Sequence, residues 1–220
     1  MTERHPAETT GDLSAVLAFA WSPAAYMDAS WWCEDWLPPS LFERLRENPR
    51  SRRHLSNFLL RTLGLGDGGV IGRDSPEADL ALVEGRRLQR LVVLAGVTLL
   101  SGHIARVLRG PDRRRIKDAL GDADYEFAVR RGRLLLQQAK VKGGVPGVDL
   151  SDSEGVDEAS RRCGVASLAT ALQDAPAAVV RRVQLKLPRT FVERHWEPLG
   201  PRSAEFLRLF RLLDRQVQEA

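Results

Sequence analysis

The sequence is poor in cysteine and has no long apolar run. Its 220 residues include two cysteines, Cys33 and Cys163, which lie 130 positions apart and form no Cys-x-x-Cys motif. Structural zinc sites and disulfide scaffolds need more cysteines at closer spacing, so the sequence excludes both. We expect two free thiols in a reducing compartment.

The apolar runs are too short to cross a membrane. The longest, residues 91–102 (LVVLAGVTLLSG), is interrupted by small and polar residues and falls short of the roughly 18 apolar residues that a spanning helix needs. The first residues, MTERHPAETTGDL, carry Glu3 and Glu8, which is not the pattern of a secretory signal. The sequence therefore predicts a soluble, cytoplasmic protein.

The overall composition is that of an ordinary globular protein, with 43% hydrophobic and 28% charged residues. The net charge of +4 hides an uneven distribution: −4 over residues 1–80, +8 over 81–142, −4 over 143–180 and +4 over 181–220. Of the 33 basic residues 29 are arginine, whose forked donors suit carboxylates and phosphates. This pattern indicates surfaces of opposite charge rather than a uniformly cationic protein.

Helical periodicity dominates the chain, and few segments alternate with the period of a strand. We expect an all-α fold, a single compact multi-helix domain over residues 13–220, with a flexible tail at 1–12 and a loop or disordered insertion at about 141–155. The expected helices begin at Pro38–Ser40 and then cover 52–63, 85–109, 113–120 (capped by Asp112), 123–139, 156–173, 176–185 and a last segment capped by Ser203. An irregular stretch is expected between Pro188 and Pro201.

No residue pattern indicates catalysis, a metal or a cofactor. The four histidines (His5, His54, His103 and His195) lie in no nucleophile or metal motif, and we expect packing or surface roles for them. Cys163 follows two arginines that could lower its thiol pKa, although a structural role is the stronger expectation. The glycine-rich stretch 64–72 lacks the Gly-Lys-Ser/Thr that a phosphate loop needs.

Four of the five tryptophans lie within 16 residues. We expect Trp21 and Trp36 in the core. In the adjacent pair Trp31–Trp32, at most one ring can easily point inward, so the other is exposed or contacts a partner. With Glu34 and Asp35, this pair predicts an aromatic partner-binding surface with an acidic rim.

A basic block surrounds the Gly110–Pro111 turn. It predicts a second candidate surface, made of Arg106, Arg109, Arg113, Arg114, Arg115, Arg130, Arg131 and Arg133. Three interpretations remain open: a solvated helix face, a dock for an acidic protein surface, or a nucleic-acid-binding face in a helical regulator that uses block 106–133.

The order of several short motifs resembles the SctK (YscK) family. These motifs are Phe19-x-x-Ser-Pro-x-x-Tyr26, Ser30-Trp31, Trp36-Leu-Pro38, Leu59-Leu-Arg-Thr-Leu-Gly-Leu65, Leu80-Ala-Leu-Val-Glu-Gly-Arg-Arg-Leu88, Ala119-Leu-Gly-Asp-Ala-Asp-Tyr-Glu-Phe127 and Val183-Gln-Leu-Lys-Leu-Pro188. The likeness covers residues 17–139 closely and 163–215 loosely. Relative to the family pattern, Trp32–Asp35 is an insertion.

The resemblance implies a mainly helical adaptor without catalytic residues or cofactors. Proteins of this family are accessory components of the cytoplasmic sorting platform of bacterial type III secretion systems. They link pods built from the SctQ protein to the cytoplasmic domain of the inner-membrane ring protein SctD. We therefore expect these two proteins as partners, a location at the inner-membrane face of the secretion apparatus, and neither nucleic-acid binding nor membrane insertion.

Overall fold

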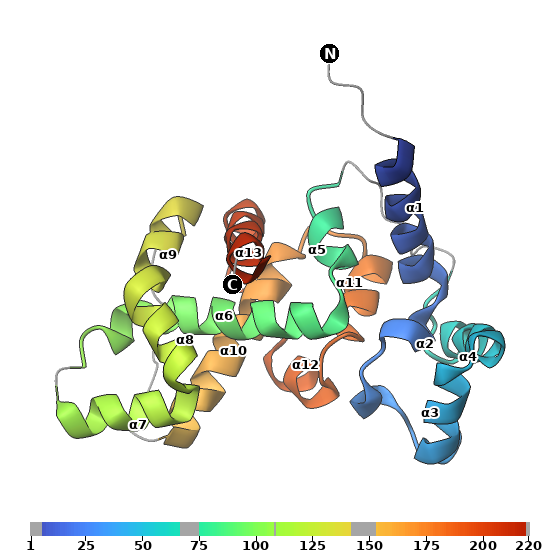
Figure 1. Cartoon of the computed structure of the whole chain (residues 1–220), viewed down its shortest axis with the longest axis horizontal. Coiled ribbons are helices and arrows are strands. Elements are labelled where there is room, and N and C mark those ends of the chain that lie inside the picture. The colour runs from blue at the N-terminus through green and yellow to red at the C-terminus, as the bar shows by residue number, and fades with distance from the viewer. Residues whose placement is uncertain (1–5, 67–74, 108, 142–152, 219–220) are drawn as a thin grey trace. The chain divides into compact units, whose positions relative to one another are not determined.

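The structure is a computed structural model that describes residues 6–66, 75–107, 109–141 and 153–218 (Figure 1). Every regular element in these ranges is helical, and none of them contains a strand. The expected all-α fold is confirmed. The chain divides into two compact units, one made of residues 1–86 and 175–189, the other of 87–174 and 190–220.

Along the described ranges of the chain, one helix follows another. The first half of the chain contains α1 (Pro6–Trp21), α2 (Pro23–Tyr26), the 3-10 turn η1 (Ala29–Trp31), α3 (Pro39–Glu47), α4 (Pro49–Thr62), α5 (Ala78–Leu82) and α6 (Gly85–Ile104). The second half contains α7 (Gly110–Leu120), α8 (Asp122–Phe127), the π-helical turn η2 (Ala128–Gly132), α9 (Arg133–Ala139), α10 (Ser153–Ala171), α11 (Ala177–Gln184), α12 (Arg189–His195) and α13 (Ser203–Gln218).

Local signals explain the helix ends in the first unit. Pro39 and Pro49 occupy first-turn positions, where the missing N–H of proline costs nothing. The side chain of Asn48 caps α4 by accepting a hydrogen bond from the backbone N–H of Arg50 (3.0 Å). Gly64, at φ +59°, ends the same helix. Helices α1, α2, α3 and α4 pack together, and α11 joins them through α5.

The second unit is built on α6, which is apolar nearly all round and buried, as its sequence predicts. Its backbone meets that of α10 at two glycines. A Cβ on Gly96 would collide with the carbonyl of Ser160, and one on Gly164 with that of Val92. Glycine is therefore needed at positions 96 and 164 for α6 and α10 to cross this closely. Elsewhere in the unit, α13 packs on α9 and α10, and α7 also packs on α10.

Several boundaries differ from the sequence prediction. Helix α6 ends at Ile104 rather than Arg109, and Arg109 rather than Asp112 precedes α7, because Pro111 already fits the first turn. Residues 189–195, expected to be irregular, form α12. Helix α1 begins at Pro6, within the segment expected to be a tail.

The domain limits predicted from the sequence stay predictions. Residues 1–5 and most of the expected loop at 141–155 lie outside the described residues. In the part of the chain that the structure describes, no helix is long and apolar enough to cross a membrane.

Candidate partner-binding surfaces

The predicted aromatic surface is a stacked cluster around α3 and α4. Trp32 stacks on the buried ring of Phe42, with 3.9 Å between ring centroids. Trp36 meets Trp32 edge to face at 5.2 Å and Phe58 at 5.8 Å. The indole N–H of Trp32 donates to the carbonyl of Leu37 (2.9 Å). Such pairs add roughly 0.5–1.5 kcal/mol each beyond area burial, so the cluster fixes the loop between η1 and α3.

This aromatic cluster is only partly covered. Trp32 and Trp36 are half-buried and Phe58 is exposed, while Glu34 and Asp35 are exposed beside them. The structure thus brings aromatic rings and carboxylates together at one surface. Their partner-binding role stays a prediction.

Trp31 is the inward-pointing member of the Trp31–Trp32 pair. Its ring is buried, its indole N–H donates to the carbonyl of Leu187 (2.8 Å), and the guanidinium groups of Arg181 and Arg189 lie 4.9 and 5.9 Å from its centroid. Contacts within the chain account for this ring, which leaves it little area for a partner. The expectation that Trp21 lies in the core is wrong, because its side chain is 44% exposed on α1.

The basic block lies on α7, η2 and α9 and, with Arg106 and Arg109, on the connection before α7, all in the second unit. Within the described residues, some of its cations are paired: Arg115 with Asp112 (3.4 Å), Lys117 with Asp122 (3.1 Å) and Arg130 with Glu126 (3.5 Å). A second group is exposed, and none of its members forms an ion pair with a described residue. This group, called the basic face below, consists of Arg106, Arg109, Arg113, Arg114, Arg131 and Arg133.

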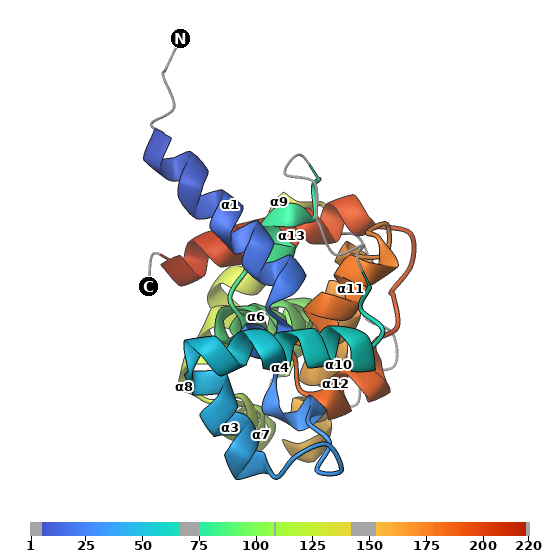
Figure 2. The same cartoon turned by 90° about the vertical axis from the view of Figure 1, so that its right-hand side faces the viewer.

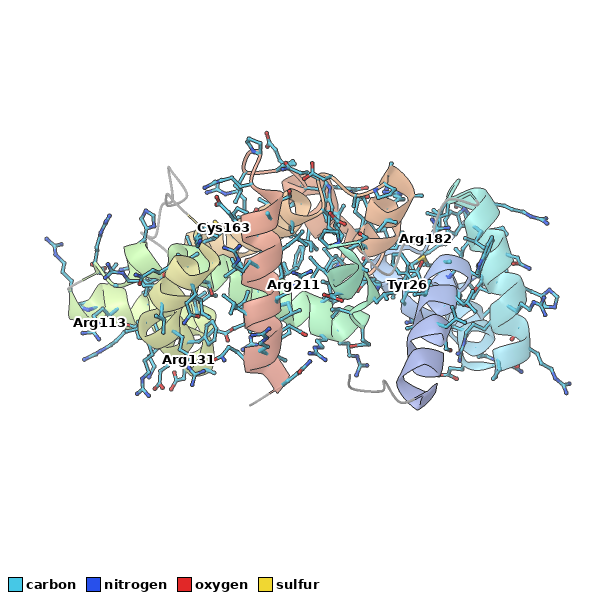
Figure 3. All side chains as sticks on the ribbon, turned by 90° about the horizontal axis from the view of Figure 1, so that it is seen from above. Tyr26, Arg113, Arg131, Cys163, Arg182 and Arg211 are labelled. Carbon is cyan, nitrogen blue, oxygen red and sulfur yellow. The ribbon has the colours of Figure 1, made fainter. Side chains whose placement is uncertain are left out.

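Arg113 and Arg131 lie at the edge of the second unit (Figure 3). A shallow groove between α7 and α8 is lined by Gly110, Arg113, Arg114, Lys117, Tyr125 and Glu126. There the Nε of Arg113 donates to the hydroxyl of Tyr125 (3.3 Å). Arg90 pairs with Asp124 (Nη1 to Oδ2, 2.7 Å) and so holds α8 on α6. Packing therefore fixes the helices that carry the basic face, while the cations themselves remain available.

Two buried cations of the first unit were not predicted from the sequence. The side chain of Arg182 is 1% exposed, and its guanidinium donates to four backbone carbonyls at 3.0–3.3 Å: those of Ala20, Leu65, Gly66 and Ala178. The carbonyl of Ala20 lies in the last turn of α1, where the helix dipole favours a cation, and that of Leu65 lies just beyond the end of α4. Burial lowers the pKa of Arg182, and burial also raises that of the nearby Tyr26 hydroxyl (Figure 3).

Lys186, four residues after Arg182, is also a buried cation that donates to backbone carbonyls. Its ammonium group donates to the carbonyls of Ala81 (2.6 Å) and Val83 (2.7 Å), at the end of α5, and lies 4.9 Å from the ring centroid of Phe19. Burial lowers the pKa of Lys186 to about 7, against the charge of Glu84, which favours the protonated form. At helical spacing, positions 179, 182, 183 and 186 share one face. The sequence signal for these two buried cations was therefore their place beside two valines on that face.

Three of the histidines and Cys163 lie on four different helices. His54 is exposed on α4, His103 is on α6, and His195 lies 3.0 Å from a carboxylate oxygen of Glu158. Burial raises the pKa of the Cys163 thiol to about 11, and the charge of Arg162 offsets this only in part. The idea of a lowered thiol pKa is therefore wrong. Within the described ranges no group of three or more His, Cys, Asp or Glu side chains can hold a metal ion.

Comparison with known proteins identifies the family. No curated protein matches the chain, and no solved structure matches it. The family model described as YOP proteins translocation protein K (YscK) matches residues 15–218, nearly the whole chain. The resemblance seen in the sequence is thereby confirmed, and the chain belongs to the YscK family of type III secretion proteins.

Proposed function

We propose that the chain is a non-enzymatic adaptor of the type III secretion sorting platform. In this role it links the SctQ pods to the cytoplasmic domain of SctD, on the cytoplasmic side of the inner membrane. Membership of the YscK family supports a secretion-apparatus component with protein partners.

The observation that carries the proposal is the basic face of the second unit. Six exposed arginines there have no carboxylate partner among the described residues, although the same helices hold several acidic side chains. Arginine forks bind carboxylates in two-point geometry, so an acidic protein surface complements this face. The acidic aromatic cluster lies in the other unit, which gives the chain two chemically different surfaces.

A nucleic-acid-binding regulator would use the same face. Carboxylates interrupt it, because Asp112, Asp122 and Glu126 pair with cations on α7 and η2. A phosphate backbone would meet these carboxylates as well as the arginines, which weakens the electrostatic attraction on which such binding depends. A gel shift with duplex DNA at low ionic strength would support the regulator and contradict the adaptor.

The test is charge reversal of two arginines that make no ion pair with a described residue, Arg113→Glu with Arg114→Glu. A matched control, Arg208→Glu with Arg215→Glu, reverses two exposed arginines on α13. We expect the first double variant to lose about tenfold or more in affinity for one platform component at low salt, and less at high salt. Unchanged recovery of both SctQ and SctD would show that the basic face is not a docking surface.

A further inference from the structure

Helix α1 has an apolar side that its own unit leaves uncovered. Val16, Phe19 and Ala20 point into the core. On the other side, Leu13 is 51% exposed, Leu17 49% and Trp21 44%, at the i, i+4, i+8 spacing of a single stripe. From Leu13 to Trp21 the sequence LSAVLAFAW has no charged residue. A helix that is apolar all round is normally covered on both sides, so this stripe indicates a missing neighbour.

The exposed residues beside the stripe are small. Ser14, Ala15 and Ala18 flank Leu17 and are exposed. Small side chains let a second helix approach closely, with larger residues packed between the two backbones. The shape of this side of α1 therefore fits another helix.

The stripe ends at a basic row on α4. Figure 2 shows α4 passing across the end of α1, and the two helices are in contact. A groove there is lined by Trp21 together with Asn57, Leu60 and Arg61. Arg53, Asn57 and Arg61 recur at i, i+4, i+8 and are all exposed. Helix α4 contains no acidic residue, and no described carboxylate pairs with Arg53 or Arg61.

We propose that this surface of the first unit binds an amphipathic helix of a partner protein. The partner's apolar face lies along Leu13, Leu17 and Trp21, and carboxylates at one of its ends lie over Arg53 and Arg61. The inference rests on the proposed adaptor function, because an adaptor needs partner surfaces besides the basic face. Helix α1 itself carries Glu8 and Asp12 before the stripe, so a second copy of this chain is the competing occupant, and the crosslinking test below distinguishes it from a partner protein.

The first test is photo-crosslinking in the full chain, made in its own bacterium, with a benzophenone amino acid at position 17. We expect a crosslink to another protein, in a segment with helical apolar periodicity and acidic residues at one end. A crosslink to a second copy of this chain, or to a segment without carboxylates, would overturn the inference. So would the absence of any product from position 17 when the same probe at position 113 gives one.

The second test uses Leu17→Glu and, separately, Arg61→Glu. The matched control is Leu134→Glu, which places the same charge at a 53% exposed leucine in the other unit. Because position 17 is exposed, the variant should keep the helical circular dichroism and melting temperature of the parent. We expect recovery of the crosslinked protein to fall about tenfold or more for both variants and to stay unchanged for the control.

These outcomes separate the inference from the adaptor function. If Leu17→Glu and Arg61→Glu still recover both platform components in full, the inference fails and the adaptor function stands. If the unmodified chain recovers neither component, the adaptor function fails. A crosslink from position 17 to an acidic amphipathic helix of another protein would still support the binding surface in that case.

Discussion

The crossing of α6 and α10 gives the sharpest stability prediction, because two glycines of the same helix should respond in opposite ways to alanine. A Cβ at Gly96 would lie 2.9 Å from the carbonyl carbon and well inside contact distance of the carbonyl oxygen of Ser160. A Cβ at Gly102 would meet nothing within 4 Å. Gly96→Ala and Gly102→Ala therefore make the same substitution in one helix. The new methyl group meets the backbone of α10 at position 96 and open space at position 102.

The structure sets the size of the effect. To accept the methyl group, α6 and α10 must separate by about 1 Å, a gap that forfeits a quarter to a half of the local dispersion attraction. Overpacking of this kind costs roughly 1–3 kcal/mol, and more where backbone has to move. The better helix propensity of alanine returns about 1 kcal/mol. The balance of the two terms is a net loss of about 1–2 kcal/mol for Gly96→Ala, whereas Gly102→Ala should gain up to about 1 kcal/mol.

Thermal unfolding followed by circular dichroism measures both variants. At roughly 2–4 °C per kcal/mol for a chain of this size, Gly96→Ala should melt about 2–8 °C below the parent and Gly102→Ala at or slightly above it. Hydrogen exchange should show faster opening of the amides of α6 and α10 in Gly96→Ala. If both variants gained stability equally, the two backbones would not be in contact at Gly96 and the packing described for the second unit would be wrong.

Three further predictions concern buried groups. Arg182→Met leaves the buried carbonyls of Ala20 and Leu65 without donors, so urea unfolding should show a loss of about 2–5 kcal/mol; no loss would mean that desolvation of the guanidinium cancels its hydrogen bonds. Lys186, whose pKa is lowered to about 7, stays protonated in the unfolded chain up to its ordinary pKa. Stability should therefore rise between pH 7 and 9 by about 1 kcal/mol per pH unit relative to Lys186→Met, and parallel curves for the two proteins would contradict this. With Ellman's reagent Cys33 should react at once and Cys163, buried and with its pKa raised to about 11, only on unfolding; two equally fast thiols would show that α10 is not packed as described.

The features that could be predicted from the sequence have local causes. The glycine at position 64 ends α4, and the paired prolines at 38 and 39 begin α3, because each residue restricts its own backbone. The long apolar sequence of α6 also predicts a buried helix, because its side chains are hydrophobic nearly all round. Helix α12 was missed because Pro188 suggested irregular chain, although proline is compatible with the start of a helix.

The burial of Arg182 and Lys186 depends on hydrogen-bond acceptors that are distant in sequence. Three of the four carbonyls that Arg182 bonds lie 116–162 positions earlier, and the two that Lys186 bonds lie 103 and 105 positions earlier. The net charge of a sequence segment does not distinguish a buried cation from an exposed one. The arginines of the basic face raise the same difficulty, because the sequence supplies the cations but only packing shows which of them find a carboxylate.

The α1 stripe shows why an apolar segment alone cannot mark a binding surface. Residues 13–21 carry no charge that would mark an exposed side, and Trp21 was expected in the core from its place in the tryptophan cluster. The structure covers one side with the first unit and leaves Leu13, Leu17 and Trp21 exposed. Exposed apolar area at this spacing costs free energy in water, so a second helix that covers it would stabilise the unit as well as bind to it. A partner seated there should therefore slow hydrogen exchange in α1 itself, beyond the protection of the contact residues.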